Sequence, residues 1–122
     1  MPIEIRYDPP RRILLGTIEG RLDIDEFRTV LEAIERSKEY PPDVATLWDL
    51  RGLDFTSIDR EFEEHLIAIR KDFPGRARAK LAAVVATDLA FGMSRMFQIL
   101  SDDKDRMKVF RDYDAAVSWL RA

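Results

Sequence analysis

The sequence predicts an α/β fold with a single mixed, mostly parallel five-stranded sheet and four helices, in the order β-β-α-β-α-β-α-β-α. Segments with the two-residue periodicity of strands alternate with segments that have the periodicity of helices. The runs at 44–48 and 81–86 are nearly continuous in apolar residues, which is typical of parallel strands covered on both faces. Such alternation implies right-handed crossovers between parallel strands. The 122 residues fit one domain, residues 1–122.

Two strands are expected at the start of the chain. Residues 3–7 alternate apolar and polar side chains, which predicts a short strand with one solvated face. The following Asp-Pro-Pro at 8–10 predicts a turn, because proline fixes the backbone and donates no hydrogen bond to a sheet. Residues 13–19 are the second strand, which Gly20 ends. We expect it to pair antiparallel with the first strand, at or near an edge of the sheet.

The first helix is expected to begin at Asp23, because Asp23 and Glu26 have the spacing of a capping box. Its buried face recurs at helical spacing, and Pro41 and Pro42 separate the helix from the next strand. The residues of that face are Phe27, Val30, Leu31 and Ile34.

The central stretch, 44–57, combines a strand with the loop that follows it. Trp48 has apolar neighbours on both sides of the strand, so we expect it to be largely buried. The change to polar residues at 49–52 predicts the carboxyl end of the strand, the edge of an α/β sheet at which ligands usually bind. A hydroxyl of Thr56 or Ser57 is expected to cap the second helix, since Thr56 and Asp59 have capping-box spacing.

The remaining elements repeat this pattern. The second helix should bury a stripe of Ile58, Phe62, Leu66, Ile69 and Phe73, and Pro74 and Gly75 should end it. A buried strand follows at 81–86, then a third helix capped by Thr87 and Asp88, with a buried stripe of Leu89, Met93, Met96, Phe97 and Leu100. A short strand at 107–111 leads to a helix at 113–120 that Asp112 caps, with Val117 and Leu120 facing inward.

Composition excludes several classes of function. The chain has no cysteine and one histidine, His65, so thiolate catalysis and clusters of cysteine or histidine around a metal are excluded. A net charge of −3, without a basic stripe, argues against a nucleic-acid-binding surface. No glycine-rich phosphate loop occurs, and the sequence indicates no cofactor. No apolar run is long enough to span a membrane and no signal peptide is recognisable, so we expect a cytoplasmic protein that is not an integral membrane protein.

Three segments, at 49–52, 88–92 and 109–112, carry a resemblance to a known family. With them go Phe55, Arg95, Met96, Phe97, Ala116, Trp119 and Leu120. The sequence resembles the bacterial STAS domains, the fold of the anti-sigma-factor antagonists, and more narrowly the STAS-like group of small bacterial proteins that shares its shape with CRAL-TRIO lipid-transfer domains. The antagonists carry a phosphorylatable serine after the central strand. In an ungapped match Ile58 takes that position here, so the resemblance does not extend to the kinase switch.

The candidate binding residues lie at the expected carboxyl edge and on the third helix. They are Asp49, Arg51, Thr56, Ser57, Thr87, Asp88, Phe91 and Arg95. A structural role is the alternative for each: ion pairing for Asp49 and Arg51, helix capping for the hydroxyl residues and Asp88, and burial for Phe91. We expect Phe91 to face away from the buried stripe, near Arg95 and Ile99, where an aromatic with a cation can anchor an interface.

These observations predict a non-enzymatic interaction module whose partner is a protein, with a weak homodimer through the third helix as one form of that contact. The alternative is a carrier of a small apolar ligand or lipid in a pocket between the helix at 89–102 and the sheet, where methionines adapt to irregular shapes. An enzyme is the third hypothesis, because no nucleophile and base are recognisable. A filled core with an exposed apolar patch would favour the module, and an apolar cavity of several hundred cubic ångströms the carrier.

Overall fold

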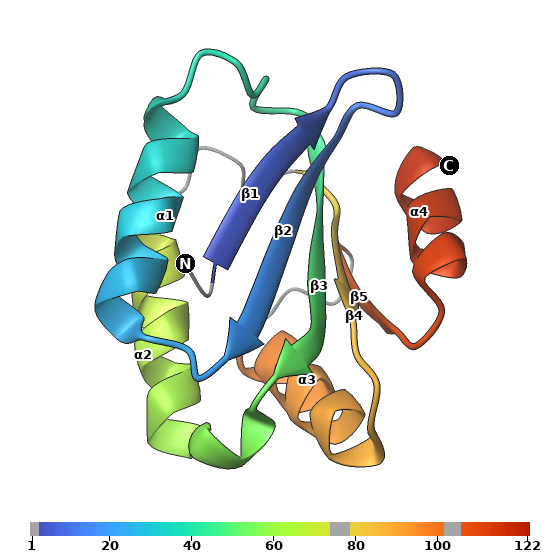
Figure 1. Cartoon of the computed structure of the whole chain (residues 1–122). Coiled ribbons are helices and arrows are strands. Elements are labelled where there is room, and N and C mark those ends of the chain that lie inside the picture. The colour runs from blue at the N-terminus through green and yellow to red at the C-terminus, as the bar shows by residue number, and fades with distance from the viewer. Residues whose placement is uncertain (1–2, 74–78, 102–105) are drawn as a thin grey trace.

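The structure is a computed structural model that describes residues 3–73, 79–101 and 106–122. Its sheet has five strands in the spatial order β1-β2-β3-β4-β5; β1 is antiparallel to β2 and the other neighbouring pairs are parallel (Figure 1). The strands are β1 (Ile3–Asp8), β2 (Ile13–Gly20), β3 (Ala45–Leu53), β4 (Leu81–Val84) and β5 (Met107–Phe110). The helices are α1 (Ile24–Arg36), α2 (Arg60–Lys71), α3 (Asp88–Leu100) and α4 (Tyr113–Arg121), with a 3₁₀ turn η1 (Phe55–Ser57). The predicted fold class and element order are confirmed.

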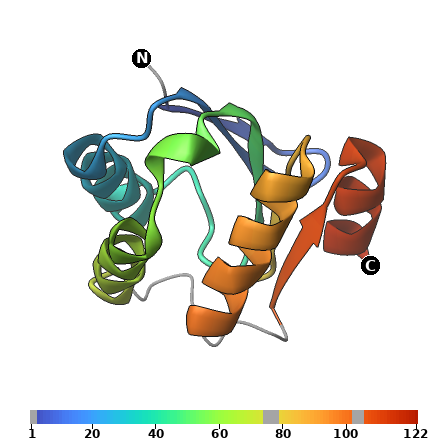
Figure 2. The same cartoon turned by 90° about the horizontal axis from the view of Figure 1, so that it is seen from below.

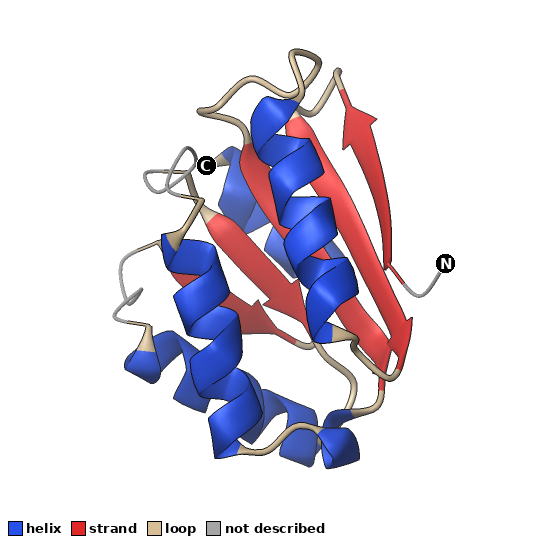
Figure 3. Cartoon of the chain, turned by 90° about the vertical axis from the view of Figure 1, so that its left-hand side faces the viewer, coloured by secondary structure: helices blue, strands red, loops and turns tan. Residues whose placement is uncertain are grey.

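The helices cover the two faces of the sheet unequally. Helices α1, α2 and α3 lie on one face and α4 lies alone on the other (Figure 2). Figure 3 shows α1 and α2 side by side in front of the sheet. Helix α4 packs on β3, β4 and β5, and its buried residues also cluster with Ile13 and Leu15 of β2 (Figure 1).

Trp48 of β3 faces helices α1 and α2 and is 8% exposed, which confirms that it is buried. Its indole packs beside Phe27, with 6.2 Å between ring centroids. On β2, the neighbouring strand, Gly16 gives the indole room, because a Cβ at this position would lie 2.5 Å from two ring carbons. The absent side chain at Gly16 is thus part of the packing around Trp48.

The predicted helix caps are confirmed for three helices. The side chains of Asp23, Thr87 and Asp112 accept hydrogen bonds from backbone N–H groups in the first turns of α1, α3 and α4. The prediction for α2 is wrong, because its cap is Asp59, which accepts from the backbone N–H of Phe62 at 2.8 Å. Thr56 and Ser57 belong instead to η1, a separate turn before the helix.

The predicted end of the central strand is also wrong. β3 continues through Asp49 and Arg51 to Leu53, because β2 remains paired beside it as far as Gly20. The polar residues therefore do not mark the end of the strand. They mark the point at which the α4 face of the strand becomes partly exposed to solvent, beside Asp49.

The buried face of α3 differs from the predicted stripe. Ala90 and Ser94 are the buried residues of this helix, whereas Leu89 and Met96 are 52% and 46% exposed. Apolar residues occur all around α3, so their spacing does not select a face. The small residues Ala90 and Ser94 are the most buried of the helix, whereas the larger Phe91 and Phe97 are only partly buried against the core.

Candidate functional site

A cavity of about 420 Å³ lies between the sheet and helices α1, α2 and α3. It is partly open to solvent, and its wall is mainly apolar. Leu14 and Ile18 of β2, Trp48 and Leu50 of β3 and Ala83 of β4 form its floor, because alternate residues of parallel strands face the same layer. The helical residues of the wall include Phe27, Leu31, Leu66, Met93, Ser94 and Phe97.

The cavity is wider than the pocket that the sequence predicted. Met93 and Phe97 of α3 line it as expected, but α1 and α2 contribute as much of the wall as α3 does. Its volume falls within the range of about 300–1,000 Å³ that is usual for ligand sites. The geometry can therefore enclose an apolar molecule of moderate size.

One buried acidic side chain lies in this mainly apolar wall, whereas the other acid that lines it, Glu35 of α1, is exposed. Glu63, in the first turns of α2, is 5% exposed, and its Oε2 has no hydrogen-bond partner among the described residues. Burial raises the pKa of the Glu63 carboxyl above its ordinary value, and the charge of Arg60 opposes this effect in part. Buried carboxylates are normally paired, so an unpartnered oxygen at a cavity wall is unusual.

The sequence analysis did not single out Glu63. The only signal was its position three residues before Leu66, which places the two side chains on the same side of the helix. A glutamate in this place looks like an ordinary acid of the first helical turn, where acids are stabilised by the helix dipole.

At the opposite end of α2, the cavity wall becomes basic. Arg70 lines the cavity, and its guanidinium carbon lies 5.4 Å from the centroid of the Phe97 ring. Lys71 and Arg106 also contribute to the wall. The cavity thus has the buried Glu63 near one end of α2 and basic residues near the other, and the exposed Glu35 of α1 also lines its wall.

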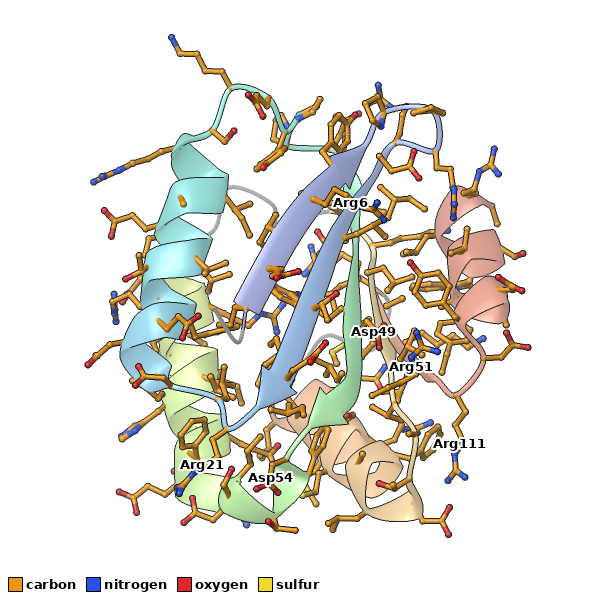
Figure 4. The ribbon with its side chains drawn as sticks, in the orientation of Figure 1. Arg6, Arg21, Asp49, Arg51, Asp54 and Arg111 are labelled. Carbon is orange, nitrogen blue, oxygen red and sulfur yellow. The ribbon has the colours of Figure 1, made fainter. Side chains whose placement is uncertain are left out.

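Thr56 and Ser57 lie in η1, after β3, and both hydroxyls are used by the turn itself. The Thr56 hydroxyl donates to the Asp54 carboxylate, and the Ser57 hydroxyl donates to the Asp54 carbonyl oxygen at 2.9 Å. The hydrogen bonds from Thr56 lower the pKa of Asp54, and the positive charge of Arg21 nearby lowers it further (Figure 4). Phe55 of the same turn lines the cavity, so the turn forms part of its wall.

Asp49 and Arg51 form an ion pair on the α4 face of β3 (Figure 4). Arg51 Nη2 lies 2.8 Å from Asp49 Oδ2, and the guanidinium lies over the Tyr113 ring at 5.3 Å. The hydrogen bond from the Arg51 side chain lowers the pKa of Asp49. This pair lies across the sheet from the cavity, and neither residue lines it.

Thr87, Asp88 and Phe91 gather at the start of α3. Thr87 caps the helix, and Asp88 pairs with Arg111, whose guanidinium lies 5.2 Å from the Phe91 ring centroid. Phe91 is half-buried against the core beneath α3, which differs from the exposed position that the sequence predicted.

The outer face of α3 has other exposed residues. Arg95 is exposed, and so is Ile99, at 52%. The large apolar residues of α3 that are exposed are Leu89, Met96 and Ile99.

The described part of the chain has neither a cluster of metal ligands nor a membrane-spanning helix. No group of three or more histidines, aspartates or glutamates is placed to hold a metal ion in residues 3–73, 79–101 and 106–122. Within the same ranges, no helix combines the length and the hydrophobicity needed to cross a bilayer.

Comparison with known proteins agrees with this architecture. A solved structure similar to this chain is that of an uncharacterized protein of the DUF3478 family, with a SpoIIAA-like fold, from Shewanella loihica PV-4. The two chains are 19% identical, the TM-score is 0.66, and the match covers 97% of this chain and 91% of that one. No protein-family model and no curated protein matches the sequence. The fold is therefore SpoIIAA-like, the STAS-like arrangement that the sequence resemblance predicted.

Proposed function

We propose that this protein binds and carries a small apolar ligand in the cavity between the sheet and helices α1 to α3. The observation that carries the proposal is the cavity itself, at about 420 Å³ and with a mainly apolar wall. The mainly apolar lining favours a ligand with a hydrocarbon part, because apolar surfaces gain free energy when they leave water together.

The lining supports an apolar occupant. The cavity is partly open to solvent, so water fills it when no ligand is bound. Water beside a mainly apolar wall finds few hydrogen-bond partners, and a hydrocarbon group that displaces this water removes apolar surface from contact with it.

Trp48 provides a direct test, because it lines the cavity, whereas Trp119 packs with Phe110 on the opposite face of the sheet. In a Trp119→Phe background, we expect titration with 1-decanol to change Trp48 emission along a saturable one-to-one curve. Ser94→Phe should abolish the change, because Ser94 lines the cavity and its replacement would fill it.

Ser118→Phe is the matched control, because the same substitution is then made on the exposed side of α4. It should leave the titration curve unchanged. A linear response without saturation, or one that Ser94→Phe does not alter, would contradict the proposal.

A protein contact through α3 is a second candidate function, favoured by the exposed apolar side chains of Leu89, Met96 and Ile99. All three lie on one helix. Gly92, which lies between Leu89 and Met96 in the sequence, has no side chain that would prevent a partner from approaching the helix. A second copy of this chain is the partner we propose, since a two-fold contact of identical faces is the commonest form of homo-oligomer.

A further inference from the structure

Glu63 differs from every other residue of the cavity wall. It is a titratable group with 5% exposure, its Oε2 has no hydrogen-bond partner among the described residues, and it lines the cavity. An unpartnered buried carboxyl oxygen costs free energy in either protonation state, because it has left water without a replacement donor. A natural protein retains such a group when something else supplies the missing partner.

We propose that Glu63 binds a hydrogen-bond donor at the end of an otherwise apolar ligand, a hydroxyl or an ammonium group. This inference rests on the proposed function of the cavity and adds the chemical class of its ligand. The donor group would lie against the Glu63 carboxyl, after a side-chain movement that brings the buried Oε2 to the cavity surface, and the hydrocarbon part would extend along α2 between the helices and the sheet.

The two protonation states of the carboxyl both suit this class of ligand. An ionised Glu63 accepts a hydrogen bond from a hydroxyl or pairs with an ammonium group, and a protonated Glu63 can both donate to and accept from a hydroxyl. A carboxylate at the same place would be repelled by the ionised form. The wall therefore selects against an acid group next to Glu63.

The basic end of the cavity makes the choice of probe important. Arg70 follows Glu63 by seven residues along α2, which is about 10 Å at roughly 1.5 Å per residue. A fatty acid could place its carboxylate near Arg70 and leave only methylene groups near Glu63. A change at residue 63 should then affect alcohols and amines but not acids.

Isothermal titration calorimetry with three probes, 1-decanol, decylamine and decanoate, tests this inference on the full chain near neutral pH. Glu63→Leu should weaken binding of 1-decanol and decylamine by at least about tenfold, the effect of losing a hydrogen bond to a charged or polar carboxyl. Decanoate affinity should change by less than about threefold, since it does not use the carboxyl. Glu63→Gln should keep the 1-decanol affinity, because its amide oxygen still accepts, and weaken decylamine binding, because the charge is gone.

The outcomes separate this inference from the function on which it rests. If the wild type binds none of the three probes, the cavity is not a ligand site and both proposals fail. If the probes bind but Glu63→Leu shifts all three affinities equally or not at all, the cavity binds ligands and only the role of Glu63 is refuted. Circular dichroism shows whether both variants are folded. If Glu63→Leu is not folded, Glu63→Gln, which preserves the shape of the side chain, tests the role of Glu63 through its loss of decylamine binding.

Discussion

At the scale of the residue, two glycines show that side-chain packing and helix propensity affect stability independently. Gly16 lies beside the indole of Trp48, where a Cβ would come within 2.5 Å of the ring. Gly92 lies within α3 with no atom within 4 Å of an added Cβ. The same substitution should therefore have opposite effects at the two positions.

We expect Gly16→Ala to destabilise the protein by about 1–3 kcal/mol through overpacking, and Gly92→Ala to stabilise it by about 0.5–1 kcal/mol through helix propensity. Urea denaturation of both variants measures the difference. Equal effects of the same sign would show that the packing around Trp48 is not as described.

Glu63 makes a residue-scale prediction about pH. An ordinary glutamate titrates near 4.5, and burial raises the pKa of Glu63 above this value in the folded protein. Below 4.5 the carboxyl is protonated in both the folded and the unfolded chain. As the pH rises through the window between the two pKa values, the unfolded chain loses its proton first, so the free energy of unfolding falls.

Glu63→Gln removes that titration. The variant should therefore gain stability relative to the wild type as the pH rises from about 4 to about 7, with urea midpoints as the measure. Glu61→Gln is the control, because it makes the same substitution at an exposed position in the first turn of α2, and it should not show this gain. A constant difference between Glu63→Gln and the wild type across this range would argue that burial does not perturb the carboxyl.

At the scale of the element, the cap of α2 can be tested, because the structure places a different residue there from the one that the sequence predicted. Asp59 accepts a hydrogen bond from the first turn of α2, whereas the hydroxyls of Thr56 and Ser57 bond within η1. Asp59→Ala should cost about 0.5–2 kcal/mol, the usual value of a helix cap. Ser57→Ala should cost less in the same chemical denaturation assay, and a larger loss for Ser57→Ala would restore it as the cap.

The sequence allowed most elements to be predicted, because their periodicity and caps were unambiguous. Asp23 and Asp112 begin their helices as expected, and the apolar run at 81–86 contains β4. The buried face of α3 was not predictable, since Leu89 and Met96 are apolar yet exposed while Ser94 is polar yet buried. Spacing identifies a helical face only when the other faces are polar.

The candidate site was predictable only in part for a related reason. The sequence indicated that α3 could line a pocket, and Met93 and Phe97 do so. The size of the cavity depends on how far three helices lie from the sheet, a tertiary quantity that no local pattern records. Glu63 was missed because an acid in the first turns of a helix is common at the surface, and only its neighbours in space make it buried.

At the scale of the whole molecule, self-association tests the role of the outer face of α3. The candidate anchor proposed from the sequence, Phe91, is half-buried and packs against the core, so replacing it would confuse unfolding with dissociation. Ile99 is the better position, because it is 52% exposed. Ile99→Glu should convert a weak dimer to monomer in sedimentation velocity without changing the circular dichroism spectrum.

Ala115→Glu, on the exposed side of α4, is the matched control and should leave the dimer intact. A wild type that remains monomeric at high micromolar concentration would refute the proposal that α3 forms a contact between two copies of this chain. The ligand-binding proposal does not depend on that result, because Ile99 does not line the cavity.

Native mass spectrometry tests the central claim, ligand binding in the cavity, most directly. The protein should be measured as purified, then after incubation with 1-decanol, beside the Ser94→Phe and Ser118→Phe variants. We expect one bound molecule per chain in the wild type and in Ser118→Phe, and none in Ser94→Phe. Spectra that show only the unliganded mass for the wild type as the 1-decanol concentration rises, or equal adducts on all three proteins, would contradict the account.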